Sequence, residues 1–197
     1  MTIALFAAGS LSAQSANEWL QSLNTSLGKS YAMELYVTLG SVDSVDDQLA
    51  GYFMVDGDGY YINLGAMEVY SDGKLRYEVN NERKEVTEDR VNLEAKDLLS
   101  NPTRAFSFLP DEFTASVVVT TDKGAVLALK SKSRDLGITA IMLSLERSQC
   151  KVLPTEISYD YDGDLVTISL AMVNDESLTL RRWNKAEYRA YDIVSFL

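Results

Sequence analysis

Two short acidic stretches come closest, in residue type and spacing, to a catalytic or metal-binding pattern. Asp56 and Asp58 are separated by one glycine, and Asp160, Asp162 and Asp164 alternate with other residues. Carboxylates so grouped can bind calcium or act in pairs in hydrolysis. The second stretch lacks the twelve-residue loop and terminal glutamate of an EF-hand. Tight hairpin turns explain both stretches, and a hydrolase would need their acids, Asp56 and Asp162 first, to converge in one cleft.

The sequence contains no histidine, and its single cysteine is Cys150. A Ser-His-Asp triad and a histidine-based zinc site are therefore excluded. No intrachain disulfide can form. Cys150 has no base or second cysteine nearby in the sequence that would use a thiolate, so a structural or incidental role is expected. We therefore expect a protein that is not an enzyme and that holds no metal and no cofactor.

Tyrosine is frequent, with eleven residues, and most of them fall in strand-like runs. Half-buried strands favour tyrosine for packing reasons alone, which is one sufficient explanation. The other explanation is a lined interior, because curved sheets of this size can enclose more space than their own side chains fill. The tyrosines concerned are Tyr52, Tyr60, Tyr61, Tyr70, Tyr77, Tyr159 and Tyr161.

Length and charge limit the class of protein. The 197 residues are 46% hydrophobic and 24% charged, which suits one globular domain. Eighteen basic and twenty-nine acidic residues give a formal net charge of −11. That charge repels nucleic acid and anionic membrane surfaces at long range, so no nucleic-acid partner is expected.

The first residues are typical of a secretory signal. A short apolar run from Ile3 to Leu11 is followed by small residues, and cleavage after Ala13 is expected. No basic residue precedes the run, so we interpret residues 1–13 as a signal peptide with a truncated n-region, and residues 14–197 as the mature domain. A buried first helix beginning at Met1 is the alternative. No cysteine lies near the cut to carry a lipid anchor.

The elements that must position these residues are mostly strands. Residues 16–27 have helical spacing and are followed by Gly28. Two-residue alternation then predicts strands near 31–39, 49–55, 60–64, 67–71, 74–79 and 83–87, and again at 113–120, 125–131, 138–146, 152–160, 165–173 and 178–183. Asp-Gly pairs and similar turns join them. Between them, residues 90–108 lack strand periodicity, and Asn101-Pro102 favours the start of a short helix that lies across the sheet as a lid.

These patterns predict a mainly β (α+β) fold. We expect a single curved antiparallel sheet of about eleven strands, forming an incomplete β-barrel whose apolar concave face is covered by helices.

The order of several short motifs resembles that of the LolA/LolB family of bacterial outer-membrane lipoprotein carriers, in its LolA-like Bacteroidetes-type branch. The motifs are a leading helix, a glycine opening the second strand, Val69-Tyr70-Ser71-Asp72-Gly73-Lys74 with Tyr77 shortly after, Glu85-Val86, Leu99–Pro102, Leu153-Pro154 and the run 188–196. The resemblance implies a periplasmic, non-enzymatic, monomeric carrier that shields the acyl chains of lipoproteins on the way to the outer membrane. It also implies an inner-membrane lipoprotein-release transporter and an outer-membrane receptor as partners. Asp56–Gly59 replaces the family's basic, proline-containing hairpin, so the family's arginine latch does not carry over.

The inward faces of the first half are the expected acyl-binding residues, covered by three lid residues. The cavity set is Met33, Leu35, Val37, Phe53, Val55, Ile62, Leu64, Val69, Leu75 and Tyr77, and the lid set is Leu98, Phe106 and Leu109. The alternative is an envelope protein-interaction or sensing domain on the same fold, in which these side chains form a filled core.

Overall fold

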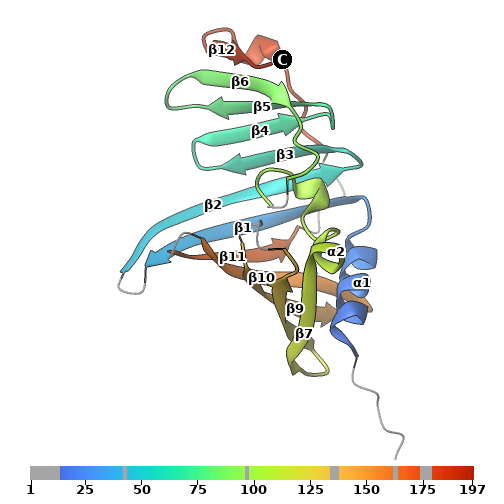
Figure 1. Ribbon diagram of the computed structural model, residues 1–197. Helices are drawn as coiled ribbons and strands as arrows, with labels where there is room; N and C mark the ends of the chain where they lie inside the picture. The colour runs from blue at the N-terminus through green and yellow to red at the C-terminus, as the bar shows by residue number, and fades with distance from the viewer. Residues whose placement is uncertain (1–13, 42–43, 96–97, 134–137, 162–163, 174–178) are drawn as a thin grey trace, which may run out of the picture.

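The structure is a computed structural model that describes residues 14–41, 44–95, 98–133, 138–161, 164–173 and 179–197. These residues form one twelve-stranded sheet in the order β12-β6-β5-β4-β3-β2-β1-β11-β10-β9-β8-β7 (Figure 1). The strands are β1 Ser30–Ser41, β2 Ser44–Asp56, β3 Gly59–Leu64, β4 Met67–Ser71, β5 Leu75–Asn80, β6 Glu85–Arg90, β7 Phe113–Thr120, β8 Gly124–Ser131, β9 Ala140–Ser148, β10 Lys151–Tyr161, β11 Asp164–Met172 and β12 Asp192–Ser195. The helices are α1 Ala16–Leu27, η1 Pro102–Arg104, α2 Leu109–Glu112 and η2 Lys185–Tyr188.

The sheet is curved and open, which confirms the predicted fold class. Its end strands, β12 and β7, pair with one neighbour each and not with each other. All pairings are antiparallel except that of β12 with β6. Helices α1 and α2 lie together beside the strands from β7 to β10 (Figure 1). Among the residues that the structure describes, no helix has the length and apolarity needed to cross a membrane.

The predicted turn chemistry explains the first-half hairpins. Gly57 has φ +61° in the two-residue turn from β2 to β3, and Gly73 has φ +90° in the turn from β4 to β5. These angles lie where a side chain would be strained, so glycine suits both positions. In the second turn, the Asp72 carboxylate accepts hydrogen bonds from the backbone N–H groups of Lys74, at 2.8 Å, and Leu75, at 2.9 Å.

Helix α1 forms as its sequence predicts. Ser15 and Glu18 make a reciprocal capping box, and Gly28, with φ +64°, ends the helix. Trp19, Leu20 and Leu23 are at most 1% exposed, so the apolar stripe of the helix is fully buried against the sheet.

The sheet is covered on both faces in its first half. Along β3, Tyr60 and Ile62 belong to the large core on the inner face, under the helices, while Tyr61 belongs to a smaller core on the outer face. Residues 179–191 lie across that outer face (Figure 1). The predicted strand at 178–183 is therefore wrong for residues 179–183, which have no strand structure.

Candidate ligand site beneath the lid segment

Residues 91–95 and 98–112, which we call the lid segment, lie on the inner face between the end of β6 and the start of β7. Asn101 caps the short helix η1 as predicted, since its side-chain oxygen accepts hydrogen bonds from the Thr103 backbone N–H at 3.2 Å and from the Thr103 hydroxyl at 2.6 Å. Pro102 occupies the first turn, where no N–H is needed. The underside is apolar, and the three predicted lid residues Leu98, Phe106 and Leu109 are 2–6% exposed within the inner core.

A small apolar cavity of about 40 Å³ lies between the lid segment and the second half of the sheet. The lid contributes Leu98, Leu99, Ala105, Phe108 and Leu109. Strands β9, β10 and β11 and the approach to β9 contribute Ile138, Ile141, Leu143, Ile157, Tyr159 and Ile168. Such a lining offers dispersion contacts and exclusion of water, which suits a hydrocarbon and not a polar reactant.

Two tyrosine hydroxyls fasten the middle of the lid segment to the first half of the sheet. Tyr31 on β1 donates to the Pro102 carbonyl at 2.8 Å, and Tyr60 on β3 donates to the Ser100 carbonyl at 3.1 Å. Burial raises the pKa of Tyr31, so this hydroxyl remains a donor at any physiological pH. Sequence reasoning missed both roles because a hydroxyl on a strand has no local signature for its partner.

A second set of hydrogen bonds, from Lys132 on the sheet side, holds the C-terminal end of the lid segment. The Lys132 ammonium donates to the carbonyls of Pro110, at 2.9 Å, and Asp111, at 3.0 Å. The Lys132 backbone N–H donates to the Glu112 carbonyl at 2.9 Å. Hydrogen bonds to its backbone thus hold the lid segment at its middle and at its C-terminal end.

Eight of the ten predicted cavity residues lie in the inner core, where they pack against the lid and one another. Met33, Leu35, Val37, Phe53, Val55, Ile62, Leu64 and Val69 are all at most 6% exposed. Of the whole predicted set, only Leu98 and Leu109 border the cavity, whose sheet side comes from the second half.

The prediction that Leu75 and Tyr77 line the cavity is wrong, because both side chains lie on the outer face of the sheet. Tyr77 packs in the outer core, and Leu75, two residues before it on β5, points the same way by strand alternation. The face was fixed by the pairing of Tyr70 with Tyr77 across β4 and β5. Two-residue alternation predicts which side chains share a face but does not say which face is inside.

In the described part of the chain, the acidic stretches and Cys150 do not form a catalytic or metal-binding group. The Asp56 carboxylate accepts a hydrogen bond from the Ser30 hydroxyl at 2.7 Å, and Asp162 lies outside the described residues. The described part of the chain has no group of three or more Asp, Glu or Cys side chains placed to hold a metal. Cys150 is exposed and free, in the turn from β9 to β10.

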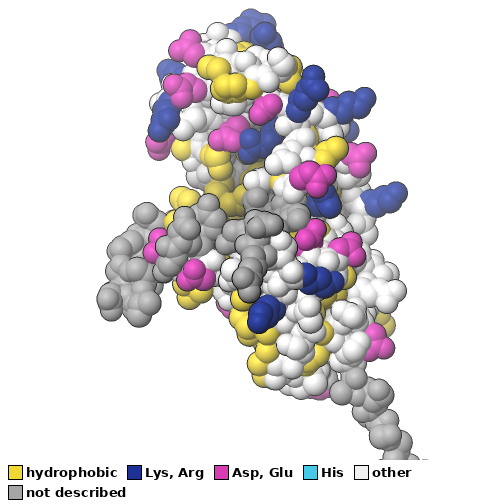
Figure 2. All heavy atoms as spheres, viewed as in Figure 1, with side chains coloured by type: hydrophobic (Ala, Val, Ile, Leu, Met, Phe, Trp, Pro, Cys, Tyr) yellow, Lys and Arg dark blue, Asp and Glu magenta, His cyan; other side chains and the backbone are white. Residues whose placement is uncertain are grey.

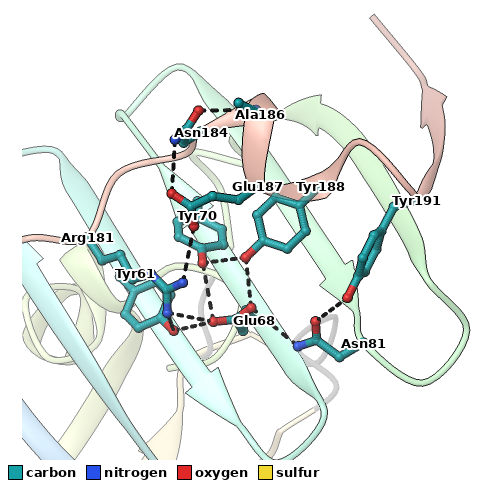
Figure 3. A network of polar contacts seen from close by, with 10 residues as sticks. All are labelled: Tyr61, Glu68, Tyr70, Asn81, Arg181, Asn184, Ala186, Glu187, Tyr188 and Tyr191. Atoms are coloured by element: carbon teal, nitrogen blue, oxygen red, sulfur yellow. Dashed lines mark hydrogen bonds and ion pairs between the residues drawn. The ribbon is translucent and has the colours of Figure 1, made fainter.

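A buried carboxylate on the outer face is the strongest polar feature of the structure (Figure 3). Glu68 on β4 is 6% exposed and accepts hydrogen bonds from the hydroxyls of Tyr61, at 2.6 Å, Tyr70, at 3.2 Å, and Tyr188, at 2.9 Å. Asn81 donates to it at 3.3 Å, and the Arg181 guanidinium lies at 3.0 Å. We call these six residues the Glu68 cluster.

The cluster keeps its carboxylate charged. Burial by itself raises the pKa of Glu68, but the hydrogen bonds of Tyr61, Tyr188 and Asn81 and the charge of Arg181 outweigh it, and the pKa falls below its ordinary value. Burial, chiefly, raises the pKa of Tyr188 to about 12. The sequence offered no sign of this cluster, because Glu68 alternates with apolar residues as a solvent-facing side chain would.

The fold and the site define a small, open-sheet protein with an apolar interior closed by a lid segment. An uncharacterised conserved protein from Thermus thermophilus has a similar structure, with a TM-score of 0.53 at 10% identity over 91% of this chain and 98% of that chain. A LolA superfamily protein from Nitrosomonas europaea matches at a TM-score of 0.43, with 10% identity over 89% of this chain and 98% of that chain. LprF from Mycobacterium bovis matches at 0.45, with 12% identity over 85% and 96% of the two chains.

The likeness to the Thermus protein shows a shared fold. The resemblance to the LolA/LolB family, with its Bacteroidetes-type branch, stays a prediction from the sequence. By sequence, no protein-family model and no curated protein matches the chain.

Proposed function

We propose that this chain is a non-enzymatic binding domain of the bacterial envelope that takes acyl chains of lipidated proteins beneath the lid segment. The observation that carries the proposal is the apolar cavity enclosed between the lid segment and strands β9, β10 and β11. In its finer form, the proposal is a periplasmic carrier that receives lipoproteins from an inner-membrane release transporter and passes them to an outer-membrane receptor. The apolar run in residues 3–11 supports export from the cytoplasm.

The size of the cavity means that ligand entry requires displacement of the lid segment. A volume of about 40 Å³ is far below the ~300–1,000 Å³ of ordinary ligand pockets. The two tyrosine hydrogen bonds to the lid contribute roughly 1 kcal/mol each. Burial of a methylene contributes about 0.8 kcal/mol, so a few methylenes of an acyl chain offset both bonds.

The proposal is tested by titrating the purified mature domain with parinaric acid, a fluorescent long-chain fatty acid. Emission should rise saturably as the chain leaves water, and palmitate should compete for the same site. A second assay asks whether the domain releases lipoproteins from inner-membrane vesicles. Failure of both assays would reject the carrier proposal, and fatty-acid binding without release would limit the proposal to acyl binding.

Loosening the lid segment is expected to strengthen binding. The double variant Tyr31→Phe/Tyr60→Phe keeps both rings but removes the two hydroxyl donors to the lid carbonyls. The open form should gain population, and the apparent affinity for parinaric acid should rise roughly tenfold. Tyr36→Phe is the matched control, because Tyr36 lies on β1 but is 55% exposed. Equal affinities in the double variant and the control would contradict the role given to the lid.

Filling the cavity is expected to weaken binding. Ala105 is 7% exposed and borders the cavity, so Ala105→Leu places a larger apolar side chain into the vacant volume. The affinity for parinaric acid should fall about fivefold or more, while the added bulk lowers the free energy of unfolding by roughly 1–3 kcal/mol. Ala171→Leu, at an exposed position on β11, should leave both quantities unchanged. A cavity that has no part in binding would give the two variants the same affinity.

A second candidate function is a protein-interaction or sensing domain with a filled interior. The dense inner core, in which the cavity measures only about 40 Å³, favours this candidate. Figure 2 shows acidic and basic side chains interspersed over the face in view. The parinaric acid titration separates the two candidates, since a filled interior would give no saturable signal.

A further inference from the structure

The hairpin of β1 and β2 extends past the neighbouring strand β3 and carries two leucines that are partly exposed on the inner face. β2 pairs with β1 from Ser44 onward but with β3 only from Gly51 onward (Figure 1). Leu39 on β1 and Leu49 on β2 are 40% and 42% exposed, and we call them the leucine pair. Leu49 lies opposite Val37 and Leu39 lies two residues after it, so both share the face of Val37, which belongs to the inner core.

Two rows of apolar side chains run across the sheet from the leucine pair to the cavity beneath the lid segment. Residues directly opposite one another on paired strands have side chains on the same face, so the register of the sheet defines each row. The row that begins at Leu49 continues through Val37, Ile168, Ile157 and Leu143. The row that begins at Leu39 continues through Val166, Tyr159 and Ile141. The last three residues of the first row and the last two of the second line the cavity.

The two rows are continuous and carry no charge. Val37 and Val166 stand between the leucine pair and the cavity lining, are 5% and 8% exposed, and belong to the same inner core. Each row therefore offers dispersion contacts along its whole length. A polar group placed along either row would lose its hydration without a charged partner, so the matching ligand is an unsubstituted hydrocarbon chain. Because the leucine pair is the exposed end of both rows, the polar end of such a ligand reaches water there.

The length of the rows suits a long acyl chain. The sheet order from the cavity to Leu49 is β9, β10, β11, β1 and β2. At about 4.8 Å between neighbouring strands, this path measures roughly 19 Å. Tetrahedral carbon–carbon bonds of about 1.5 Å advance an extended chain by about 1.25 Å per carbon, so about fifteen carbons cover the path. The cavity alone is too small for a chain of that length.

We propose that the leucine pair is a second subsite of the acyl site, which holds the part of a long hydrocarbon chain nearest to its polar end. The far end of the chain lies in the cavity, and the middle lies along the two rows beneath the displaced lid segment. The subsite makes the domain selective for chains of about fifteen carbons or more. This inference rests on the proposed function, because the cavity and the leucine pair hold one and the same chain.

The test compares palmitate, with sixteen carbons, and decanoate, with ten, as competitors of parinaric acid. Decanoate is too short to reach from β9 to the leucine pair. The variant Leu39→Ser/Leu49→Ser should therefore bind palmitate about tenfold or more weakly and bind decanoate unchanged, since each methylene returned to water costs about fourfold in affinity. Leu165→Ser is the matched control and should change neither affinity. Leu165 is 54% exposed on β11, but it lies on the outer face because the next residue, Val166, belongs to the inner core.

The outcomes separate the subsite from the cavity. If the double variant kept the wild-type ratio of palmitate to decanoate affinity, the subsite would be rejected and acyl binding in the cavity would stand. If neither fatty acid displaced parinaric acid from the wild-type protein and parinaric acid itself did not bind, both proposals would fail. Flotation with phosphatidylcholine vesicles tests the other apolar occupant. Flotation that required the leucine pair, together with an unchanged affinity ratio, would make the pair a membrane contact and overturn the subsite.

Discussion

Glu68→Ala is expected to lower the free energy of unfolding by about 3 kcal/mol. The substitution leaves the hydroxyl of Tyr61 without its 2.6 Å acceptor and takes from Arg181 its contact with Glu68 at 3.0 Å, so that the longer contact with Glu187 at 3.4 Å remains. Loss of one partner of a buried ion pair costs roughly 3–5 kcal/mol, and the lower end applies because the Arg181 side chain is 48% exposed. Urea unfolding followed by tyrosine and tryptophan fluorescence measures the change.

Glu78→Ala is the matched control on the neighbouring strand β5. Glu78 pairs with Arg76 at 2.7 Å, but its side chain is 39% exposed. An exposed pair contributes roughly 0–1 kcal/mol, so the control should change little. If the two alanine variants were equally stable, the Glu68 cluster would not be an anchor of the outer core.

The same cluster predicts a pH dependence with a definite sign. Because the folded-state pKa of Glu68 lies below its ordinary value of 4.5, the carboxylate adds stability at pH values above that value. This stability is lost as the pH falls through the folded-state pKa. The stability gap between wild-type protein and Glu68→Gln should therefore stay constant well above pH 4.5 and narrow as the pH falls below 4.5. A gap that widened on acidification would contradict the direction of the shift.

Gly51→Ala is expected to destabilise the protein by about 3 kcal/mol or more. Gly51 lies in the middle of β2, between β1 and β3, and a Cβ there would stand 2.0 Å from the backbone carbonyl oxygen of Asn63. No rotamer change relieves this contact, since both groups are fixed to the backbone. The strands must separate or shift register, which places the substitution among the severe ones. Thermal unfolding and amide exchange on β3 measure the effect.

Gly57→Ala is the control that separates the steric clash at Gly51 from the backbone strain that follows when any left-handed glycine is replaced. Gly57 has φ +61°, but no atom lies within 4 Å of the position that a Cβ would take, so alanine there meets backbone strain alone. That strain costs roughly 1–2 kcal/mol. Gly51→Ala should be clearly the more severe of the two, and the reverse order would show that β3 can move away from β2 at little cost.

Helix α1 and the first-half turns could be predicted from the sequence, because each depends on residues within one short segment. The apolar spacing of α1, its serine cap and the glycine after it act within one helix, and the structure has the predicted bounds. The Asp-Gly turns likewise set the first-half hairpins, and with them the order of neighbouring strands. One curved, open sheet was predictable because strands joined by short turns must lie side by side.

The sequence did not determine which residues meet across the sheet. Tyr60 and Tyr61 are adjacent in the chain, yet one fastens the lid and the other binds Glu68 on the opposite face. Leu75 and Tyr77 alternate correctly but point outward, because the pairing of β4 with β5 sets their face. Residues 178–183 have a sequence period typical of a strand, but the contact of Arg181 with Glu68 holds residues 179–183 across the outer face of the sheet instead.

The sequence alone determined helix α1, the turns and the strand alternation, because each depends on residue type and short spacing. It also excluded histidine-based chemistry. The position of the cavity against β9, β10 and β11, the tyrosine bonds to the lid and the buried Glu68 were decided by tertiary structure. The physical reason is that the lid segment and the C-terminal residues lie over opposite faces of the sheet, which brings residues far apart in the chain, such as Tyr31 and Pro102 or Glu68 and Arg181, within hydrogen-bond distance.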